Sequence, residues 1–181
     1  MSVLTIVRHG QASLFAADYD RLSDVGEQQG RALGTWWADQ RLVIDRVYCG
    51  PRVRHRHSAE LTGESYRLGG LRWPEPIVLE ELDEFDMDGL IHRFAPGLAE
   101  RDSNFARLAE AFLQSEHNPD RPLRFQRMFE TLLRAWQVSD SSDCDVENWP
   151  AFQQRVWGVM RRIQQQPQRG TRTVVFSSGG V

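Results

Sequence analysis

The sequence predicts an α/β protein: a three-layer sandwich around a mostly parallel sheet, with a helical insertion. Three observations lead to this fold class. Short β-branched apolar runs alternate with amphipathic helical segments, polar clusters follow the ends of those runs, and one long stretch carries helical stripes with no strand between them. Strands separated by helices pair in parallel through right-handed crossovers. We therefore expect a layered sheet, interrupted once by helices.

The first strand and helix are the clearest elements. Residues 3–7 form a β-branched run that is too short for a core helix and indicates a buried strand. Ser23 or Asp24 then caps a helix that places Val25, Leu33 and Trp37 at helical spacing.

Further strands and helices follow in alternation. Residues 42–49 predict a second strand, which Gly50 and Pro51 stop, and residues 53–66 predict a helix. Residues 76–82 predict a third strand. A helix with Pro150 in its first turn carries a stripe up to Ile163, and residues 171–176 predict the fourth strand.

Between residues 89 and 146 the pattern changes. Two amphipathic stripes, one around Phe105 and Phe112 and one around Phe129 and Trp136, follow each other without a strand candidate. We interpret the whole chain, 1–181, as a single α/β domain in which residues 89–146 form a helical hairpin inserted as a possible lid. The alternative is that these helices are ordinary crossovers on a face of the sheet. The polar residues 140–145 would connect the insertion to the last helix.

Composition excludes several classes of protein. The chain has 181 residues, of which 40% are apolar, enough for one domain with a real core. All 22 basic residues are arginine, and the absence of lysine excludes Schiff-base chemistry and the lysine of Walker nucleotide sites. The net charge of -3 argues against nucleic acid as a partner.

The chain shows no sign of a membrane or of export. No apolar run approaches the length of a membrane span, and the N-terminus lacks the features of a secretory signal. Cys49 and Cys144 lie far apart and offer neither a disulfide framework nor a zinc ribbon. We therefore expect a cytoplasmic protein without a cofactor or a metal ion.

The candidate site begins with Arg8, His9 and Gly10, at the predicted carboxyl end of the first strand. Open α/β sheets bind ligands at that edge. The glycine allows a sharp turn and leaves its amide reachable, and the arginine supplies a fixed positive charge for an oxyanion. Other polar clusters also follow a strand or open a helix, so all of them could face one cleft; they lie at 22–34, 49–60, 82–85 and 177–180.

These motifs, in this order, resemble the histidine phosphatase superfamily, also called the phosphoglycerate-mutase-like family. The resemblance implies a phosphoryl transfer in which His9 is the phosphorylated nucleophile. It implies that Arg8 and Arg54 bind the phosphoryl oxygens, with Gly10 and Ser178 also in the phosphate site. It further implies that Glu84 donates a proton to the leaving oxygen, which requires a raised carboxyl pKa. The expected ligand is a small phosphorylated substrate or inorganic phosphate.

Position 178 departs from the family pattern. The family usually has a second histidine there, whereas this chain has a serine, which carries no positive charge. Losing a charge-assisted contact costs about 10²–10³ in rate. Two functions follow: a phosphatase hydrolysing a small phosphomonoester through a phosphohistidine on His9, weakened by Ser178, or a catalytically degenerate member that binds phosphorylated ligands or a protein partner.

Other interpretations have less support. His55 and His57 suggest metal binding, but two residues apart on a predicted helix they point in different directions. His92, just beyond Glu84, is a candidate replacement for the second histidine, although an exposed loop residue is the simpler interpretation. A serine nucleophile at Ser177 or Ser178 lacks the first glycine of a nucleophile elbow. A mutase would need a cleft that excludes water.

Overall fold

The computed structural model describes residues 1–12, 20–139, 145–165 and 170–181. The chain divides into two compact units: Met1–Glu84 with Val156–Val181, and Phe85–Arg155. The predicted insertion, 89–146, falls within the second unit. Most of the predicted polar connector, residues 140–144, lies outside the described residues.

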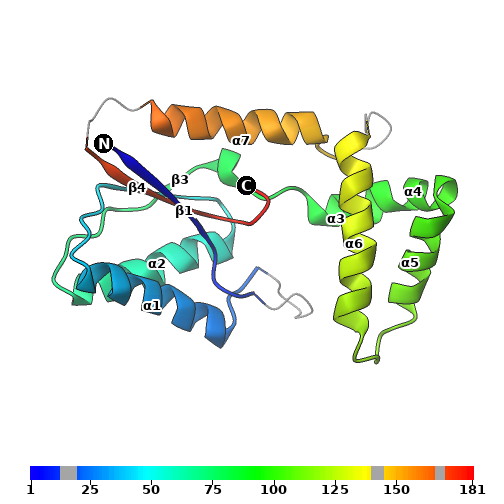
Figure 1. The fold of residues 1–181 in the computed structure, drawn as a ribbon, viewed down its shortest axis with the longest axis horizontal. Helices are drawn as coiled ribbons and strands as arrows, with labels where there is room; N and C mark the ends of the chain where they lie inside the picture. The colour runs from blue at the N-terminus through cyan, green and yellow to red at the C-terminus, as the bar shows by residue number, and fades with distance from the viewer. Residues whose placement is uncertain (13–19, 140–144, 166–169) are drawn as a thin grey trace. The chain divides into compact units, whose positions relative to one another are not determined.

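The first unit contains the sheet, whose strands run in the order β1-β4-β2-β3 (Figure 1). The four predicted strands correspond to β1 (Val3–Arg8), β2 (Arg46–Cys49), β3 (Ile77–Val78) and β4 (Arg172–Ser177). All three strand pairs are parallel, so the predicted α/β class is confirmed.

Strands β2 and β3 are shorter than predicted. Leu42 is taken up by the turn after the first helix, where its amide donates to the Trp37 carbonyl. After Val78 the chain turns into a short 3-10 helix, η1 (Glu80–Leu82), instead of extending the strand.

Helices cover both faces of this sheet (Figure 1). Helix α1 (Asp24–Asp39), which Ser23 caps as predicted, packs against α2 (Val53–Leu68) on one face. Their core, shared with the strands, consists of buried apolar residues: Trp37, Ala38, Ile44, Val47, Cys49, Ala59, Tyr66, Trp73, Val174 and Phe176. The part of α7 (Trp149–Gln164) that belongs to this unit covers the other face, burying Val159 and Ile163. The three-layer arrangement is therefore confirmed.

The second unit is helical in its described residues. It comprises α3 (Met87–Gly89), the π-helical turn η2 (Leu90–Phe94), α4 (Ala95–Arg101), α5 (Ser103–Leu113), α6 (Arg121–Val138) and the beginning of α7. Helices α5 and α6 coincide with the two predicted stripes. The rings of Phe85, Trp136, Trp149 and Phe152 pack against one another. These aromatic residues therefore form the core of the unit.

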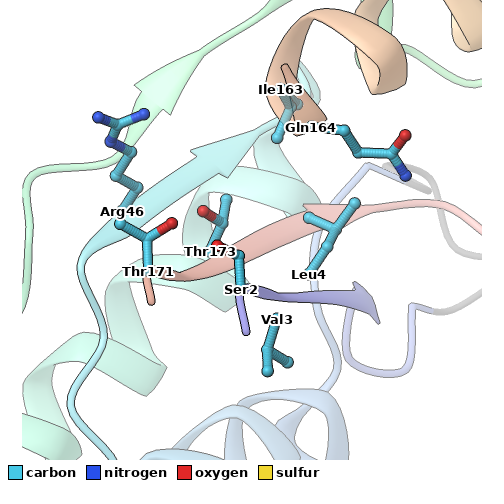
Figure 2. Close-up of a pocket in the computed structure, with 8 residues that line it drawn as sticks. All are labelled: Ser2, Val3, Leu4, Arg46, Ile163, Gln164, Thr171 and Thr173. Carbon is cyan, nitrogen blue, oxygen red and sulfur yellow. The ribbon is translucent and has the colours of Figure 1, made fainter. Parts of the chain in front are cut away.

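A pocket of about 290 Å³ lies at the amino-terminal ends of the strands, between the sheet and the end of α7 (Figure 2). Its lining is mixed: Ser2, Val3, Leu4, Arg46, Ile163, Gln164, Thr171 and Thr173. Arg46 is the one charged residue in this lining. The pocket lies at the opposite edge of the sheet from the predicted site, so it does not contain the residues singled out for chemistry.

Candidate active site

The carboxyl ends of three strands bring the candidate residues together. Arg8 pairs with Ser177 in the β1–β4 register, and Cys49 pairs with Phe176 in the β2–β4 register. The loops that follow these strands therefore begin side by side at one edge of the sheet. This is the edge at which open α/β sheets bind ligands.

His9 is a buried imidazole with a defined orientation. It is 8% exposed, and its Nδ1 lies 2.7 Å from the carbonyl oxygen of Gly10. A carbonyl only accepts, so Nδ1 carries the proton and Nε2 carries the lone pair. Arg54 donates from Nε to that Nε2 at 3.3 Å. Nε2 is thus the nitrogen available for nucleophilic chemistry.

The surroundings of His9 keep its imidazole neutral. Burial lowers the pKa of His9 below its ordinary value of 6.5, and the positive charges of Arg54 and Arg8 lower it further. The hydrogen bond to Gly10 and the charge of Asp20 oppose this shift without reversing it. Neutral imidazole is the nucleophilic form.

Arg54 contacts three other side chains of the site. It is 3% exposed, and besides His9 it contacts Asp20 Oδ1 through Nη1 at 2.9 Å and Ser178 Oγ through Nη2 at 3.3 Å. Three predicted site residues therefore converge in space: His9 directly after β1, Arg54 in the first turn of α2, and Ser178 directly after β4. A guanidinium held in this way is suited to binding an oxyanion.

Asp20 also belongs to this cluster, although it was not predicted from the sequence. Its carboxylate accepts from the backbone amide of Val53 at 2.9 Å and, at 3.4 Å, from that of Arg54. It thereby caps α2, whose own N-cap residue, Arg52, makes no side-chain cap bond. Burial alone would raise the pKa of Asp20, but these amides and the Arg54 guanidinium lower it overall. Nothing in the local sequence distinguishes Asp20 from other acidic residues.

From the sequence, His55 is a candidate metal ligand and belongs to the polar cluster at 49–60. It lies on α2, as predicted, but its ring is fully buried and its Nε2 is 2.7 Å from Ser178 Oγ. Burial, followed by the charges of Arg54 and His9, lowers the pKa of His55 to about 3. Its ring centroid is 5.8 Å from that of His9. His57 is half-buried, so the two histidines face different surroundings.

The amide of Gly10, which the resemblance implies for the phosphate site, forms a hydrogen bond within the protein. That amide donates to Ser58 Oγ at 3.0 Å, so the donor is already occupied inside the protein. A Cβ at position 10 would lie 2.3 Å from the carbonyl oxygen of Gly26. Gly10 therefore allows α1 to approach this turn closely, and its carbonyl orients His9.

Arg8 is the last residue of β1, and Glu84 lies just after η1. A Cβ built at Gly179 would lie 3.6 Å from Arg8 Nε, which places Arg8 beside the turn after β4. Glu84 is half-buried, and its amide donates to Asp83 Oδ1 at 2.8 Å. Asp83 in turn accepts from Arg52 Nε at 2.6 Å.

Among the described residues, metal-ion chemistry and thiolate chemistry have little support. None of the described residues form a group of three or more His, Cys, Asp or Glu side chains that could hold a metal ion. Burial raises the pKa of the Cys49 thiol to about 11, so this cysteine is not a thiolate nucleophile at neutral pH. Within the described ranges, the search for helices long and apolar enough to span a membrane finds none.

Comparison with known proteins gives a consistent picture. A model of the histidine phosphatase superfamily (branch 1) matches residues 4–124. No curated protein matches the chain.

Solved structures with a similar fold include phosphatases and a mutase. Bacillus stearothermophilus YhfR is 17% identical with a TM-score of 0.60, over 99% of this chain and 75% of that one. The alpha-ribazole phosphatase of Shigella flexneri is 18% identical with a TM-score of 0.56, over 97% and 73%. Phosphoglycerate mutase from Bacillus anthracis is 17% identical with a TM-score of 0.57, over 97% and 74%. At these identities the likeness shows the fold.

Proposed function

The chain belongs to the histidine phosphatase superfamily (branch 1), and from this premise we propose that it hydrolyses a small phosphomonoester through a phosphohistidine on His9. The observation that supports this most directly is the orientation of His9. Its Nδ1–H is held by the Gly10 carbonyl, and its Nε2 lone pair faces the Arg54 guanidinium.

The first half-reaction transfers the phosphoryl group to the enzyme. His9 Nε2 attacks phosphorus in line, the N–P bond forms and the bond to the ester oxygen breaks. From its position beside Nε2, Arg54 donates to the equatorial oxygens, where it and Arg8 stabilise the charge of the transition state. Glu84, when protonated, donates its proton to the departing oxygen, so the product leaves as a neutral alcohol.

The second half-reaction restores the enzyme. Glu84, now a carboxylate, accepts a proton from a water molecule, whose oxygen attacks phosphorus. The N–P bond breaks, inorganic phosphate leaves, and His9 returns to its neutral form. Ser178 contributes a neutral hydrogen-bond donor to the phosphoryl group in both steps.

Ser178 also favours a second candidate function. Because position 178 lacks a second positive imidazole, the alternative is that the chain is a catalytically degenerate member of the superfamily. Such a member would bind phosphorylated ligands or a protein partner. Arg54 and Arg8 would suffice for such binding, because they supply fixed positive charge. The helices of residues 89–146 remain candidates for a lid that selects the substrate.

Hydrolysis of p-nitrophenyl phosphate distinguishes the two functions. We expect turnover by the wild type, its loss in His9→Ala and an increase in Ser178→His. The matched control is His57→Ala, which changes a half-buried histidine on α2 outside the cluster. A ³¹P signal of a phosphoramidate in quenched wild-type enzyme, absent from His9→Ala, would identify the intermediate. Turnover that persists in His9→Ala would overturn the proposed chemistry, and binding of phosphate without turnover would favour the degenerate member.

A further inference from the structure

Among the described residues, the hydroxyl of Ser178 has two hydrogen-bond partners, both nitrogen atoms. Arg54 Nη2 lies 3.3 Å from Ser178 Oγ, and a guanidinium can only donate. His55 Nε2 lies 2.7 Å from the same oxygen. A serine hydroxyl has two acceptor lone pairs and a single proton. The direction of that proton therefore depends on which nitrogen of His55 is protonated.

The burial of His55 favours one tautomer. Among the described atoms, Nδ1 of this ring has no hydrogen-bond partner. It lies against Gly50, where a Cβ would be 2.3 Å away. A proton on Nδ1 would be a buried donor without an acceptor, and orphaned N–H groups are rarer in proteins than under-satisfied acceptors. The proton therefore belongs on Nε2, which donates to Ser178.

With Nε2–H donating, both lone pairs of Ser178 are occupied. One accepts from Arg54 and the other from His55, so the hydroxyl proton is directed away from both. The same guanidinium also contacts His9 Nε2, which places Ser178 Oγ near the position of the phosphoryl group in the proposed reaction.

We propose that His55 is a positioning residue that holds Ser178 as a hydrogen-bond donor toward a tetrahedral oxyanion bound by His9 and Arg54. This inference rests on the proposed function. It assigns roles to His55, which lies on α2, and to Ser178, whose side chain carries no charge. Together the two side chains supply a fixed neutral donor.

The electrostatics of His55 support a constant role across the physiological pH range. The lowered pKa, about 3, keeps the ring neutral, so its Nε2–H orientation does not change between pH 5 and 8. Gly50 supports the same arrangement, because any side chain there would displace the ring.

The tautomer can be tested without any activity. Long-range ¹H–¹⁵N NMR of the full chain should show His55 as the Nε2–H tautomer, unchanged between pH 5 and 8. His55→Phe and His57→Phe identify the resonances. A signal of the Nδ1–H tautomer, or titration near the ordinary pKa, would overturn the proposal whatever reaction the protein catalyses.

A double-mutant cycle tests the coupling. We expect His55→Phe and Ser178→Ala each to lower kcat for p-nitrophenyl phosphate roughly 10²-fold, as loss of one oxyanion donor does, and the double variant to lose no more than either alone. His55→Gln, whose amide can donate to Ser178, should recover activity to within about tenfold of the wild type. His57→Gln is the control and should match the wild type.

Vanadate affinity separates the possible outcomes. His55→Phe and Ser178→Ala should weaken vanadate binding by the same factor. Losses that multiply in the double variant, with no recovery in His55→Gln, would assign His55 a merely structural role and overturn the proposal. If turnover does not depend on His9, the proposed function fails, while the tautomer and vanadate measurements still decide the role of His55.

Discussion

Arg54 donates from Nε to Nε2 of His9 across 3.3 Å, so the arginine and the imidazole hold each other in place. Because Arg54 also reaches Asp20 and Ser178, its position is fixed before an anion arrives. Preorganised donors of this kind cost no reorganisation at the moment of reaction.

Replacing Arg54 tests this arrangement. Arg54→Lys keeps the positive charge but lacks the planar fork that joins His9, Asp20 and Ser178. We expect kcat/KM for p-nitrophenyl phosphate to fall roughly 10²–10³-fold. The control is Arg56→Lys, an exposed arginine on the same helix, which should leave the activity unchanged. A loss smaller than about threefold in Arg54→Lys would show that charge alone suffices.

The acid limb of the pH profile reports on His9. Its pKa is lowered from 6.5, so the neutral nucleophile persists below that pH and is lost only when the pH falls through the lowered value. We expect log kcat/KM to stay level through pH 6.5 and to decline only as the pH falls through the lowered pKa. In Arg8→Gln one lowering charge is removed, and the limb should move to higher pH. An acid limb above 6.5 in the wild type would contradict the lowered pKa.

His55 makes the folded protein sensitive to acid. Its pKa is about 3 in the folded state and near 6.5 when unfolded, so the unfolded chain binds the extra proton between these values. Stability should therefore fall as the pH decreases from 6.5, by up to about 1.4 kcal/mol per pH unit from this group. Arg54, His9 and Arg52 disfavour its protonation, and Asp20 favours it.

Urea unfolding of the wild type and of His55→Gln between pH 7 and 4.5 measures this contribution. The variant lacks the titrating group, so its stability should decline less steeply on acidification. His57→Gln is the control and should follow the wild type. Parallel curves for the wild type and His55→Gln would contradict the assignment.

Neutralising Asp20 should affect anion binding and stability in opposite directions. Asp20 competes with an oxyanion for Arg54 and caps α2. In Asp20→Asn we expect vanadate to bind about threefold to tenfold more tightly, because one repelling charge is lost. Unfolding free energy should fall by about 1 kcal/mol, since the negative charge at the start of α2 and beside Arg54 is lost. Asp24→Asn, at the start of α1, is the control, and unchanged vanadate affinity in Asp20→Asn would contradict the competition.

Much of the fold could be predicted from the sequence, because local pattern determines it. The run at 3–7, the cap at Ser23 and the stripe ending at Ile163 are local signals, and each corresponds to an element of the structure. The third strand is two residues long because the chain turns into η1 after it. The apolar pattern of residues 76–82 does not predict that turn.

The candidate site was predictable only in part. His9 and Arg54 carry motif signals, and they meet as the order of the motifs implies. Asp20 and the contact of His55 with Ser178 depend on how distant segments pack, and 123 positions separate the latter two. No local sequence pattern predicts such a contact, so the roles of these residues could be identified only from the structure.

Gly50 offers a last test, of the packing that holds His55. A Cβ at position 50 would lie 2.3 Å from His55 Nδ1 and 2.6 Å from the carbonyl oxygen of Leu82, closer than either contact allows. Gly50→Ala should therefore displace the ring, lower the unfolding free energy by about 1–3 kcal/mol and reduce turnover as His55→Phe does. The control is Gly158→Ala on α7, where nothing lies within 4 Å of a Cβ and where alanine should stabilise the helix by about 0.5–1 kcal/mol. Unfolding in urea and turnover of p-nitrophenyl phosphate provide the two readouts. If Gly50→Ala keeps both full stability and full turnover, the ring of His55 does not need the position in which the structure holds it.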